Sequence, residues 1–297
     1  MVQDSSTPTG STPAANRPMG SSIDWARCGL GTGTLASLGR ALPLAGVRRL
    51  LDTMLELGMP TIDTADSYGS GDCECLLAKA MAGRREQFNL VTKAGYRHGN
   101  LGGPLRPLNQ FIKKGLQRMG KHRCFESSYL ERCIHHSLKR LKTDRVEAFL
   151  LHDPPLDVIQ SGSVEALFAK IKKQGSALHT GISSGDPEVL AAALERGLCD
   201  VIQSPAGLSA AGALGGVWAL CESRSIHVIG NHVFEPSLLN DPSLTHERLM
   251  KASASLLPKS ATILCGTGNP NHFRSTLAWI MDPMPREEAW RLAAGHR

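Results

Sequence analysis

The feature that most constrains this chain is a regular alternation of short apolar runs with longer segments whose apolar residues repeat at helical spacing. Eight such pairs follow one another between Cys28 and Ile280. Strands that alternate with helices form parallel sheets, because each helix returns the chain to the start of the next strand. Eight units in about 260 residues predict a single-domain (β/α)8 barrel of the α/β class. A doubly wound open sheet is the alternative.

Several segments carry recognisable boundary signals. Pro43 opens and Gly58 closes the first helical segment, and Asp186 followed by Pro187 is a typical helix start. Ser127 or Ser128 is a candidate cap for the helix over 128–143. The other helices are expected over 72–81, 163–175 and 186–198, around Trp218, over 243–257 and over 269–281. The eight strands are expected over 27–34, 60–65, 88–93, 146–152, 177–183, 200–203, 226–231 and 261–267.

The first 22 residues, MVQDSSTPTGSTPAANRPMGSS, are rich in Ser, Thr, Pro, Gly and Ala and lack the apolar core of a secretory signal. We therefore expect a disordered tail over 1–22 and the barrel over 23–297. The uncharged stretch over 201–221 is interrupted by Pro205 and several glycines, which predicts a strand, a loop and a helix start rather than a membrane span.

The eight cysteines form no CxxC pair, so we expect buried free thiols, a reducing compartment and a cytoplasmic location. Net charge is +6, and eleven Lys or Arg residues against three acids fall within 106–145. That stretch is either a patch for an anionic substrate or a solvated helix face. Aromatic residues do not alternate with its basic ones, so nucleic acid is not an expected partner. Sequence periodicity leaves monomer and homodimer open.

The glycines at positions 29, 31 and 33 suggest a dinucleotide-binding loop of the Rossmann type. That fingerprint requires GxGxxG at the start of a helix, whereas position 34 is Thr34 and no helix is expected before Pro43. Close approach of backbone at the mouth of a barrel is a better explanation for these glycines.

Ionisable residues lie at the ends of three consecutive predicted strands, where barrel enzymes place their chemistry. Asp63 ends the second strand, Tyr68 follows it in the loop, Lys93 ends the third and His152 ends the fourth. A Lys ammonium favours the phenolate and lowers the pKa of a neighbouring Tyr, and a carboxylate holds that ammonium in place. With a His to hydrogen-bond a substrate oxygen, the set predicts proton donation to a developing oxyanion, as carbonyl reduction requires.

Each of the four residues also has a simpler explanation as a cap, a turn or a solvated strand end. Their joint occurrence at matching positions is harder to explain in that way. A metal-dependent barrel hydrolase would need several His and Asp ligands at strand ends. Only His152 is well placed, since His179 falls within its strand, so no metal is expected.

Several motifs in this order resemble the aldo-keto reductases. The specific ones are TIDTADSYGSGDCE, LVTKAGY and SLKRLKTDRVEAFLLHDPP, and weaker ones follow at 180–184, 201–205 and 263–274. The resemblance covers about Cys28 to Ile280 and implies a (β/α)8 barrel that binds a nicotinamide cofactor without a Rossmann fold. It implies an oxidoreductase that interconverts a carbonyl and an alcohol on a small molecule.

The resemblance also implies roles by position. Tyr68 would be the general acid, Lys93 and Asp63 would tune it, and His152 would orient the substrate carbonyl. Positions implied to contact the cofactor are Gly31, Thr32, Gly33, Ser183, Ser184, Gln203, Asn231, Gly266, Thr267, Asn269, His272 and Arg274.

This chain departs from the family at several positions. Asn231 replaces a nicotinamide-stacking aromatic residue, Ser184 replaces a frequent Asn, Gly266 replaces a frequent Lys, and Ser275-Thr276 replaces Glu-Asn. NADP(H) is favoured through His272 and Arg274, with NAD(H) as the other option. Two alternatives remain: an aldose dehydrogenase, suggested by HDPP at 152–155, and a non-catalytic cofactor-sensing barrel. The long segment over 96–125 is a candidate substrate wall.

Overall fold

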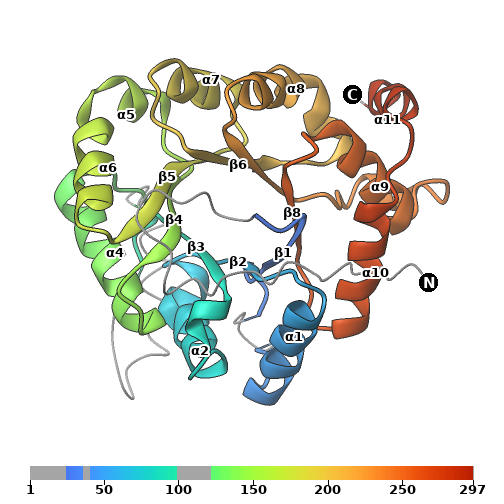
Figure 1. Cartoon of the computed structure of the whole chain (residues 1–297). Coiled ribbons are helices and arrows are strands. Elements are labelled where there is room, and N and C mark those ends of the chain that lie inside the picture. The colour runs from blue at the N-terminus through green and yellow to red at the C-terminus, as the bar shows by residue number, and fades with distance from the viewer. Residues whose placement is uncertain (1–24, 36–40, 99–121, 297) are drawn as a thin grey trace, which may run out of the picture.

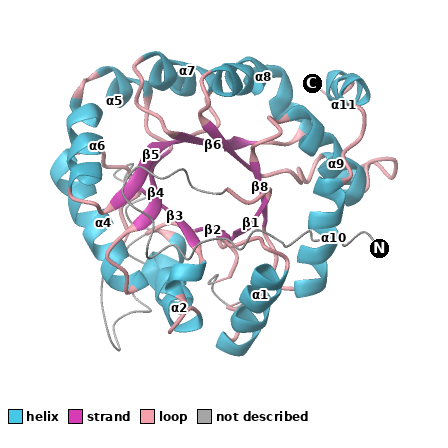
Figure 2. Cartoon of the chain, in the orientation of Figure 1, coloured by secondary structure: helices cyan, strands magenta, loops and turns pink. Residues whose placement is uncertain are grey.

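The computed structural model describes residues 25–35, 41–98 and 122–296. The predicted tail over 1–22 and most of the segment over 96–125 lie outside these ranges. Eight parallel strands pair in sequence order, and the first pairs with the last to close a barrel. Helices form a ring around the strands (Figures 1 and 2). The predicted (β/α)8 barrel is confirmed, and the open sheet is excluded.

The elements follow the predicted order closely. The strands are β1 (Cys28–Gly31), β2 (Thr61–Asp63), β3 (Asn89–Ala94), β4 (Val146–His152), β5 (Ala177–Ser183), β6 (Val201–Pro205), β7 (His227–Asn231) and β8 (Thr262–Cys265). The main helices are α1 (Leu44–Glu56), α2 (Asp72–Ala80), α4 (Ser127–Leu141), α6 (Ser163–Lys173), α7 (Pro187–Glu195), α8 (Leu208–Ser223), α9 (His246–Leu256) and α10 (Pro270–Met281).

Helix starts show which local signals decided the boundaries. Asp186 caps α7, accepting a hydrogen bond from the backbone N–H of Glu188, with Pro187 at the first helical position as predicted. The prediction for α4 was wrong, because Glu126 occupies the cap position and Ser127 is already helical. No side chain caps α4, so its first turn is stabilised by packing rather than by a hydroxyl.

Within the described ranges, two short α-helices were not predicted. Helix α5 (Leu156–Gln160) follows the paired prolines after β4, and α11 (Arg286–Ala294) follows the last barrel helix. Helix α11 packs against α8 and α9 on the outside of the ring (Figure 1). A Cβ at Gly215 would lie 2.6 Å from the Trp290 ring, so this glycine of α8 makes room for α11.

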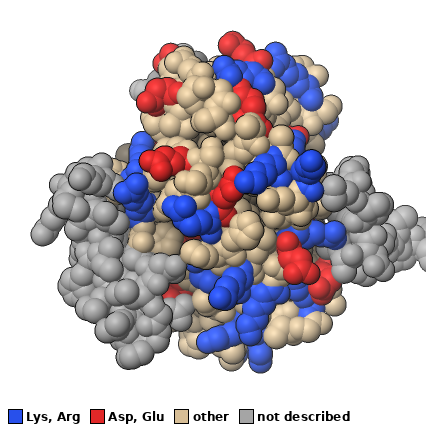
Figure 3. Space-filling view, turned by 90° about the vertical axis from the view of Figure 1, so that its left-hand side faces the viewer, with Lys and Arg blue, Asp and Glu red and all other residues tan. Residues whose placement is uncertain are grey.

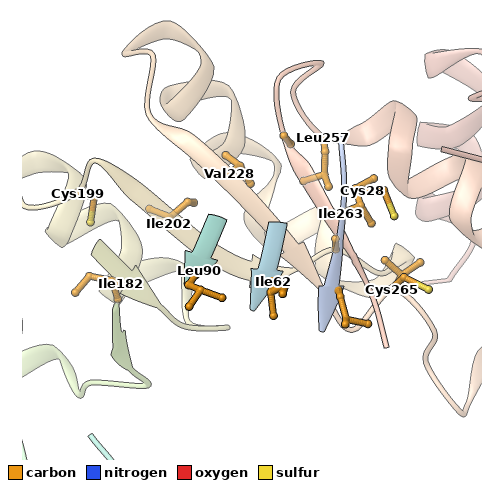
Figure 4. Packing of buried hydrophobic residues seen from close by; sticks show 14 of the residues in the cluster. Cys28, Ile62, Leu90, Ile182, Cys199, Ile202, Val228, Leu257, Ile263 and Cys265 are labelled. Carbon is orange, nitrogen blue, oxygen red and sulfur yellow. The ribbon is translucent and has the colours of Figure 1, made fainter. Parts of the chain in front are cut away.

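Apolar residues form two separate layers. The larger layer lies between strands and helices; Ile62, Leu90 and Ile202 are among its members in Figure 4. Each large side chain buried there contributes about 1.5–3 kcal/mol. The smaller layer fills the barrel interior, where Trp25 packs against it, and consists of Val91, Ala148, Leu150, Val201, Ile229 and Leu264.

All eight cysteines are free thiols, and seven of them are buried within these layers. Burial raises the pKa of Cys73 to about 11 and of Cys221 to about 12, which keeps both protonated and unreactive. None of the helices in the described ranges is long and apolar enough to cross a membrane.

Basic and acidic side chains are interspersed on the face of the molecule shown in Figure 3. Lys170 pairs with Glu131 at 2.8 Å, and Arg196 pairs with Glu165. In the described part of the basic stretch, Arg140 turns inward and donates to a buried carboxylate, that of Glu74. Arg123, Arg132, Lys139 and Lys142 are exposed, so most of the described stretch is a solvated surface.

Candidate active site

The alternation of side chains along the strands places the polar residues at one end of the barrel interior. Successive strand residues point to opposite faces, so a residue two positions after an inward apolar residue also points inward. Lys93 follows Val91 in this way, and Gln203 follows Val201. The strands run in parallel, so their last inward side chains meet at the carboxyl end, which is where barrel enzymes carry their sites.

Lys93 and Asp63 form a buried ion pair. The Lys93 Nζ donates to both carboxylate oxygens of Asp63, at 2.6 and 2.7 Å, and to the backbone carbonyl of Thr64 at 2.9 Å. Lys93 is 1% exposed and Asp63 is 3% exposed. Burial acts to lower the pKa of Lys93, but contacts with Asp63 and Tyr68 outweigh it, so that pKa is raised. The ammonium therefore stays charged.

Tyr68 is presented to this pair by a tight turn. Gly69, Ser70 and Gly71 all have positive φ, so the chain reverses directly after Tyr68 and enters α2. A Cβ at Gly71 would approach the Arg140 side chain to 2.7 Å, which explains a glycine there. The Lys93 Nζ lies 5.2 Å from the Tyr68 ring centroid.

The net shift of the Tyr68 pKa differs from the expectation. The Lys93 ammonium acts to lower it, but burial and the Asp63 carboxylate together outweigh that effect, so the pKa of Tyr68 is raised. The sequence alone suggested a lowered value, because burial and the charge of Asp63 depend on the tertiary structure. The phenol is consequently protonated at neutral pH and can act as a proton donor.

His152 completes the predicted group of four. Its ring lies edge-on to Tyr68 with centroids 6.1 Å apart. The Tyr96 ring also lies edge-on to His152, with centroids 4.8 Å apart. The four predicted catalytic residues, drawn from three strands and one loop, are thus brought together at one end of the barrel.

Gln203 and Ser183 extend this group rather than line an open surface. The Gln203 amide donates to Asp63 Oδ1 at 2.9 Å and accepts from the Ser183 hydroxyl at 2.8 Å. Ser184 is also buried, and its hydroxyl accepts from the backbone N–H of Asp186 at 3.1 Å. These three predicted cofactor positions therefore fix the ion pair and the adjoining loop.

A cavity of about 750 Å³ opens beside Tyr68 and Asp63. Six predicted cofactor positions line it, namely Gly31, Gly33, Asn231, Gly266, Thr267 and His272. The lining residues that the sequence did not suggest are Thr34, His232, Val233, Phe234, His246, Leu264, Cys265, Ser275, Thr276 and Trp279. Most of these residues come from loops and helices that follow β7 and β8. These segments lie near β1 because β8 pairs with β1 when the barrel closes.

Besides Ser183, Ser184 and Gln203, three more predicted cofactor positions do not line this cavity. Thr32 is fully buried, and its hydroxyl donates to the backbone carbonyl of Asp63 at 2.8 Å. Asn269 caps α10, accepting from Asn271 N at 2.9 Å. Arg274 points to α1 and pairs with Glu56 at 2.7 Å. Its guanidinium is therefore engaged by a carboxylate on a neighbouring helix.

A second buried carboxylate supports the turn that carries Tyr68. Glu74 is fully buried on α2, accepting from the Thr92 hydroxyl at 2.7 Å and from Arg140 Nε at 2.7 Å. It links α2 to β3 and α4. Sequence reasoning missed Glu74, although an acid in a buried stretch of an amphipathic helix is a usable signal. Among the described residues, no three His, Cys, Asp or Glu side chains are grouped to hold a metal ion.

The profile of the Aldo/keto reductase family matches residues 27–282, which is most of the chain. The chain belongs to this family. The matched range begins just before β1 and ends just after α10, so it covers the whole barrel.

Individual relatives resemble parts of the chain. An uncharacterized oxidoreductase of Bacillus subtilis, YqkF, is 32% identical over 143 residues, which is 48% of this chain and 40% of that protein. A 6-dehydroglucose reductase of Novosphingobium aromaticivorans is 30% identical over 177 residues, 52% of this chain and 51% of that protein. The matches thus span about half the length of these relatives or less.

Solved structures resemble the whole barrel. Aldo-keto reductase AKR11C1 from Bacillus halodurans, in its holo form, superposes with a TM-score of 0.71 at 21% identity, over 93% of this chain and 95% of that one. An aldo-keto reductase from Klebsiella pneumoniae in complex with NADPH gives 0.65 at 19% identity, over 90% of each chain. At these identities the superpositions establish the fold alone.

Proposed function

We propose that this aldo-keto reductase interconverts a carbonyl and an alcohol on a small molecule, using NADP(H) by preference and NAD(H) as the second option. One observation carries the proposal: the buried Lys93–Asp63 pair lies against Tyr68, which lines a cavity shared with predicted cofactor positions. A neutral phenol backed by a fixed ammonium is suited to proton donation.

Each of the four residues has a distinct task. Tyr68 donates its proton to the oxygen of the substrate carbonyl as negative charge develops there. Lys93 stabilises the phenolate that remains, and Asp63 keeps Lys93 charged and in place. His152, from the end of β4, hydrogen-bonds the same substrate oxygen and orients it. In the oxidative direction the same groups accept the proton.

The residues around the cavity fit a nicotinamide dinucleotide. A volume of about 750 Å³ lies within the usual range for cofactor sites. Aromatic Phe234 and Trp279 and polar Asn231, Thr267 and His272 line it, which suits a ligand with flat rings and phosphates. When bound, the nicotinamide would supply or accept the hydride.

The first test is a fluorescence titration of the purified protein with NADPH and with NADH, combined with turnover on a panel of reactive aldehydes. Saturable binding and turnover are expected. His272→Ala should weaken NADPH binding about tenfold, one charge-assisted contact, while NADH binding changes little. Arg274→Ala should do the same if the pair with Glu56 opens for a 2′-phosphate. No binding of either cofactor would contradict the proposal.

A second candidate is an aldose or sugar dehydrogenase that works in the oxidative direction. Two relatives, from Novosphingobium aromaticivorans and Agrobacterium fabrum, are 6-dehydroglucose reductases, which favours a sugar-like substrate. Comparing NAD-linked oxidation of aldoses with NADPH-linked reduction of aldehydes separates the two candidates. Cofactor binding without turnover in either assay would support a cofactor-sensing barrel instead.

A further inference from the structure

A row of ring contacts begins at the predicted proton donor. His152 follows Tyr68, with centroids 6.1 Å apart, and Tyr96 follows His152 at 4.8 Å. His122 in turn stacks on Tyr96, with centroids 6.0 Å apart and an interplanar angle of 16°. The Tyr96 ring therefore contacts two histidine rings, and one of these, His152, also contacts Tyr68.

Asp153 turns back toward this row. It follows the last residue of β4, and its φ of 51° is in the left-handed region, which few residue types other than Gly, Asn and Asp adopt readily. Its backbone N–H donates to Ser183 O at 2.8 Å. Its Oδ2 accepts from the Tyr96 hydroxyl at 2.8 Å. Backbone and side chain are both fixed, so the carboxylate has one defined position beside His152.

Tyr96 is held as a donor to that carboxylate. The Arg123 guanidinium lies 5.5 Å from the Tyr96 ring centroid, and its Nη2 donates to the phenol oxygen at 3.4 Å. Burial and then the contact with Asp153 raise the pKa of Tyr96, which outweighs the opposing effect of Arg123. The phenol therefore keeps its proton and donates a hydrogen bond to Asp153.

The Asp153 carboxylate retains capacity for a further donor. A carboxylate has about four acceptor positions. Within residues 25–35, 41–98 and 122–296, Tyr96 is the hydrogen-bond donor to it. Asp153 is only half-buried, so the remaining positions are accessible from outside. Its fixed place next to His152 puts these acceptor positions close to where a substrate carbonyl would bind.

We propose that Asp153, fixed by Tyr96, is a specificity-determining residue that accepts a hydrogen bond from a hydroxyl group next to the reacting carbon of the substrate. The substrate class is then hydroxylated aldehydes, or small polyols in the oxidative direction. This inference rests on the proposed function, which places the substrate carbonyl at His152. A site that hydrogen-bonds a substrate hydroxyl discriminates strongly against the analogue that lacks it.

The test compares kcat/KM for glyceraldehyde and for propanal, two aldehydes that differ in their hydroxyl groups, with NADPH as reductant. Asp153→Gly removes the carboxylate and tolerates the positive φ. It should lower kcat/KM for glyceraldehyde about tenfold, the value of one hydrogen bond, and change that for propanal less than about twofold. Tyr96→Phe should act in the same direction but less. Tyr129→Phe removes a phenol that donates to the Tyr96 backbone at 3.3 Å and does not contact Asp153, so it should leave both kcat/KM values unchanged.

Equal losses on both aldehydes would show that Asp153 merely positions His152, and no loss on either would also overturn the inference. If wild-type protein reduces neither aldehyde, the proposed function fails separately. Saturation-transfer NMR with glycerol and 1-propanol then decides the inference. A glycerol signal in the wild type that Asp153→Gly abolishes would support it, and an equal signal in both proteins would overturn it.

Discussion

The two ends of the barrel interior are built from the same strands but treat buried ionisable groups in opposite ways. At the carboxyl end, Lys93 and Asp63 are buried as a charged pair. At the amino end, β7 contributes His227, four residues before Asn231 of the cavity. The Trp25 ring stacks on His227 with centroids 4.5 Å apart. The Lys93–Asp63 pair keeps its charges, whereas the stacked His227 is neutral.

The amino end shows how burial neutralises a histidine. His227 Nε2 hydrogen-bonds the Thr262 hydroxyl at 3.0 Å, and that hydroxyl donates to the backbone carbonyl of Ala26 at 2.7 Å. The hydroxyl therefore accepts from a neutral Nε2–H. Burial, with the charges of His179 and Arg27 adding to it, lowers the pKa of His227 to about 3. The barrel interior thus holds a neutral histidine at its amino end and a charged pair at its carboxyl end.

The largest expected effect concerns the carboxyl end. Tyr68→Phe should lower turnover by about a thousandfold, because it removes the proton donor. Cofactor affinity should change less than about twofold, since the ring remains. Steady-state kinetics and the fluorescence titration measure both. Wild-type turnover in this variant would remove Tyr68 from the mechanism.

Because the pKa of Tyr68 is raised, the rate of reduction by the wild-type protein should stay level until the pH exceeds about 10.

The next largest effect should be a loss of stability when the Lys93–Asp63 pair is broken. Lys93→Met leaves Asp63 buried without its partner and should lower the free energy of unfolding by about 3–5 kcal/mol. Arg196→Met breaks the exposed pair with Glu165 and should cost less than about 1 kcal/mol. Urea titrations of both variants make the comparison. Similar losses in the two would contradict the account of the carboxyl end.

A smaller loss of stability is expected from a change at the amino end of the barrel interior. Trp25→Ala removes a ring that is stacked on His227 and packed on the interior layer, so it should lower the free energy of unfolding by about 2 kcal/mol. Turnover should be unchanged, because the site lies at the other end. Trp25→Phe keeps most of the contact and should cost about half as much. A large loss of turnover in soluble, folded Trp25→Ala would show that the two ends are coupled.

The last prediction concerns how stability depends on pH. The pKa of His227 is lowered from 6.5 to about 3, so between these values the unfolded chain binds the proton and the folded one does not. The contribution of His227 is complete above about pH 6.5 and is lost as the pH falls toward 3, at up to about 1.4 kcal/mol per pH unit. His227→Gln should flatten this slope in urea titrations at pH 4.5, 5.5 and 6.5. An unchanged slope would mean that other groups dominate it.

Particular residues show where sequence reasoning succeeded. Asp63, Lys93 and His152 were found because they end apolar runs, and a strand end is a local property of the sequence. Asp186 and Pro187 marked a helix start correctly for the same reason. Ser127 did not, because packing of the α4 apolar face, rather than a cap, decided where that helix begins.

The cavity wall and the substrate side were harder to predict. Phe234, His246 and Trp279 belong to segments after β7 and β8 that approach the site only because the barrel closes. Arg274 was assigned to a phosphate, yet it pairs with Glu56, 218 positions away. The link between Tyr96 and Asp153 spans 57 positions. No local pattern encodes such pairings.

By itself, the sequence determined the order and number of the strand–helix units, and hence the barrel. It could do so because the spacing of apolar residues within each segment depends on local sequence alone. It also determined which ionisable side chains stand at strand ends. Tertiary structure alone decided the protonation preference of these groups. Burial and charge at Lys93, Tyr68 and His227 depend on residues brought from other strands, and a pKa responds to everything within a few ångströms regardless of its place in the chain.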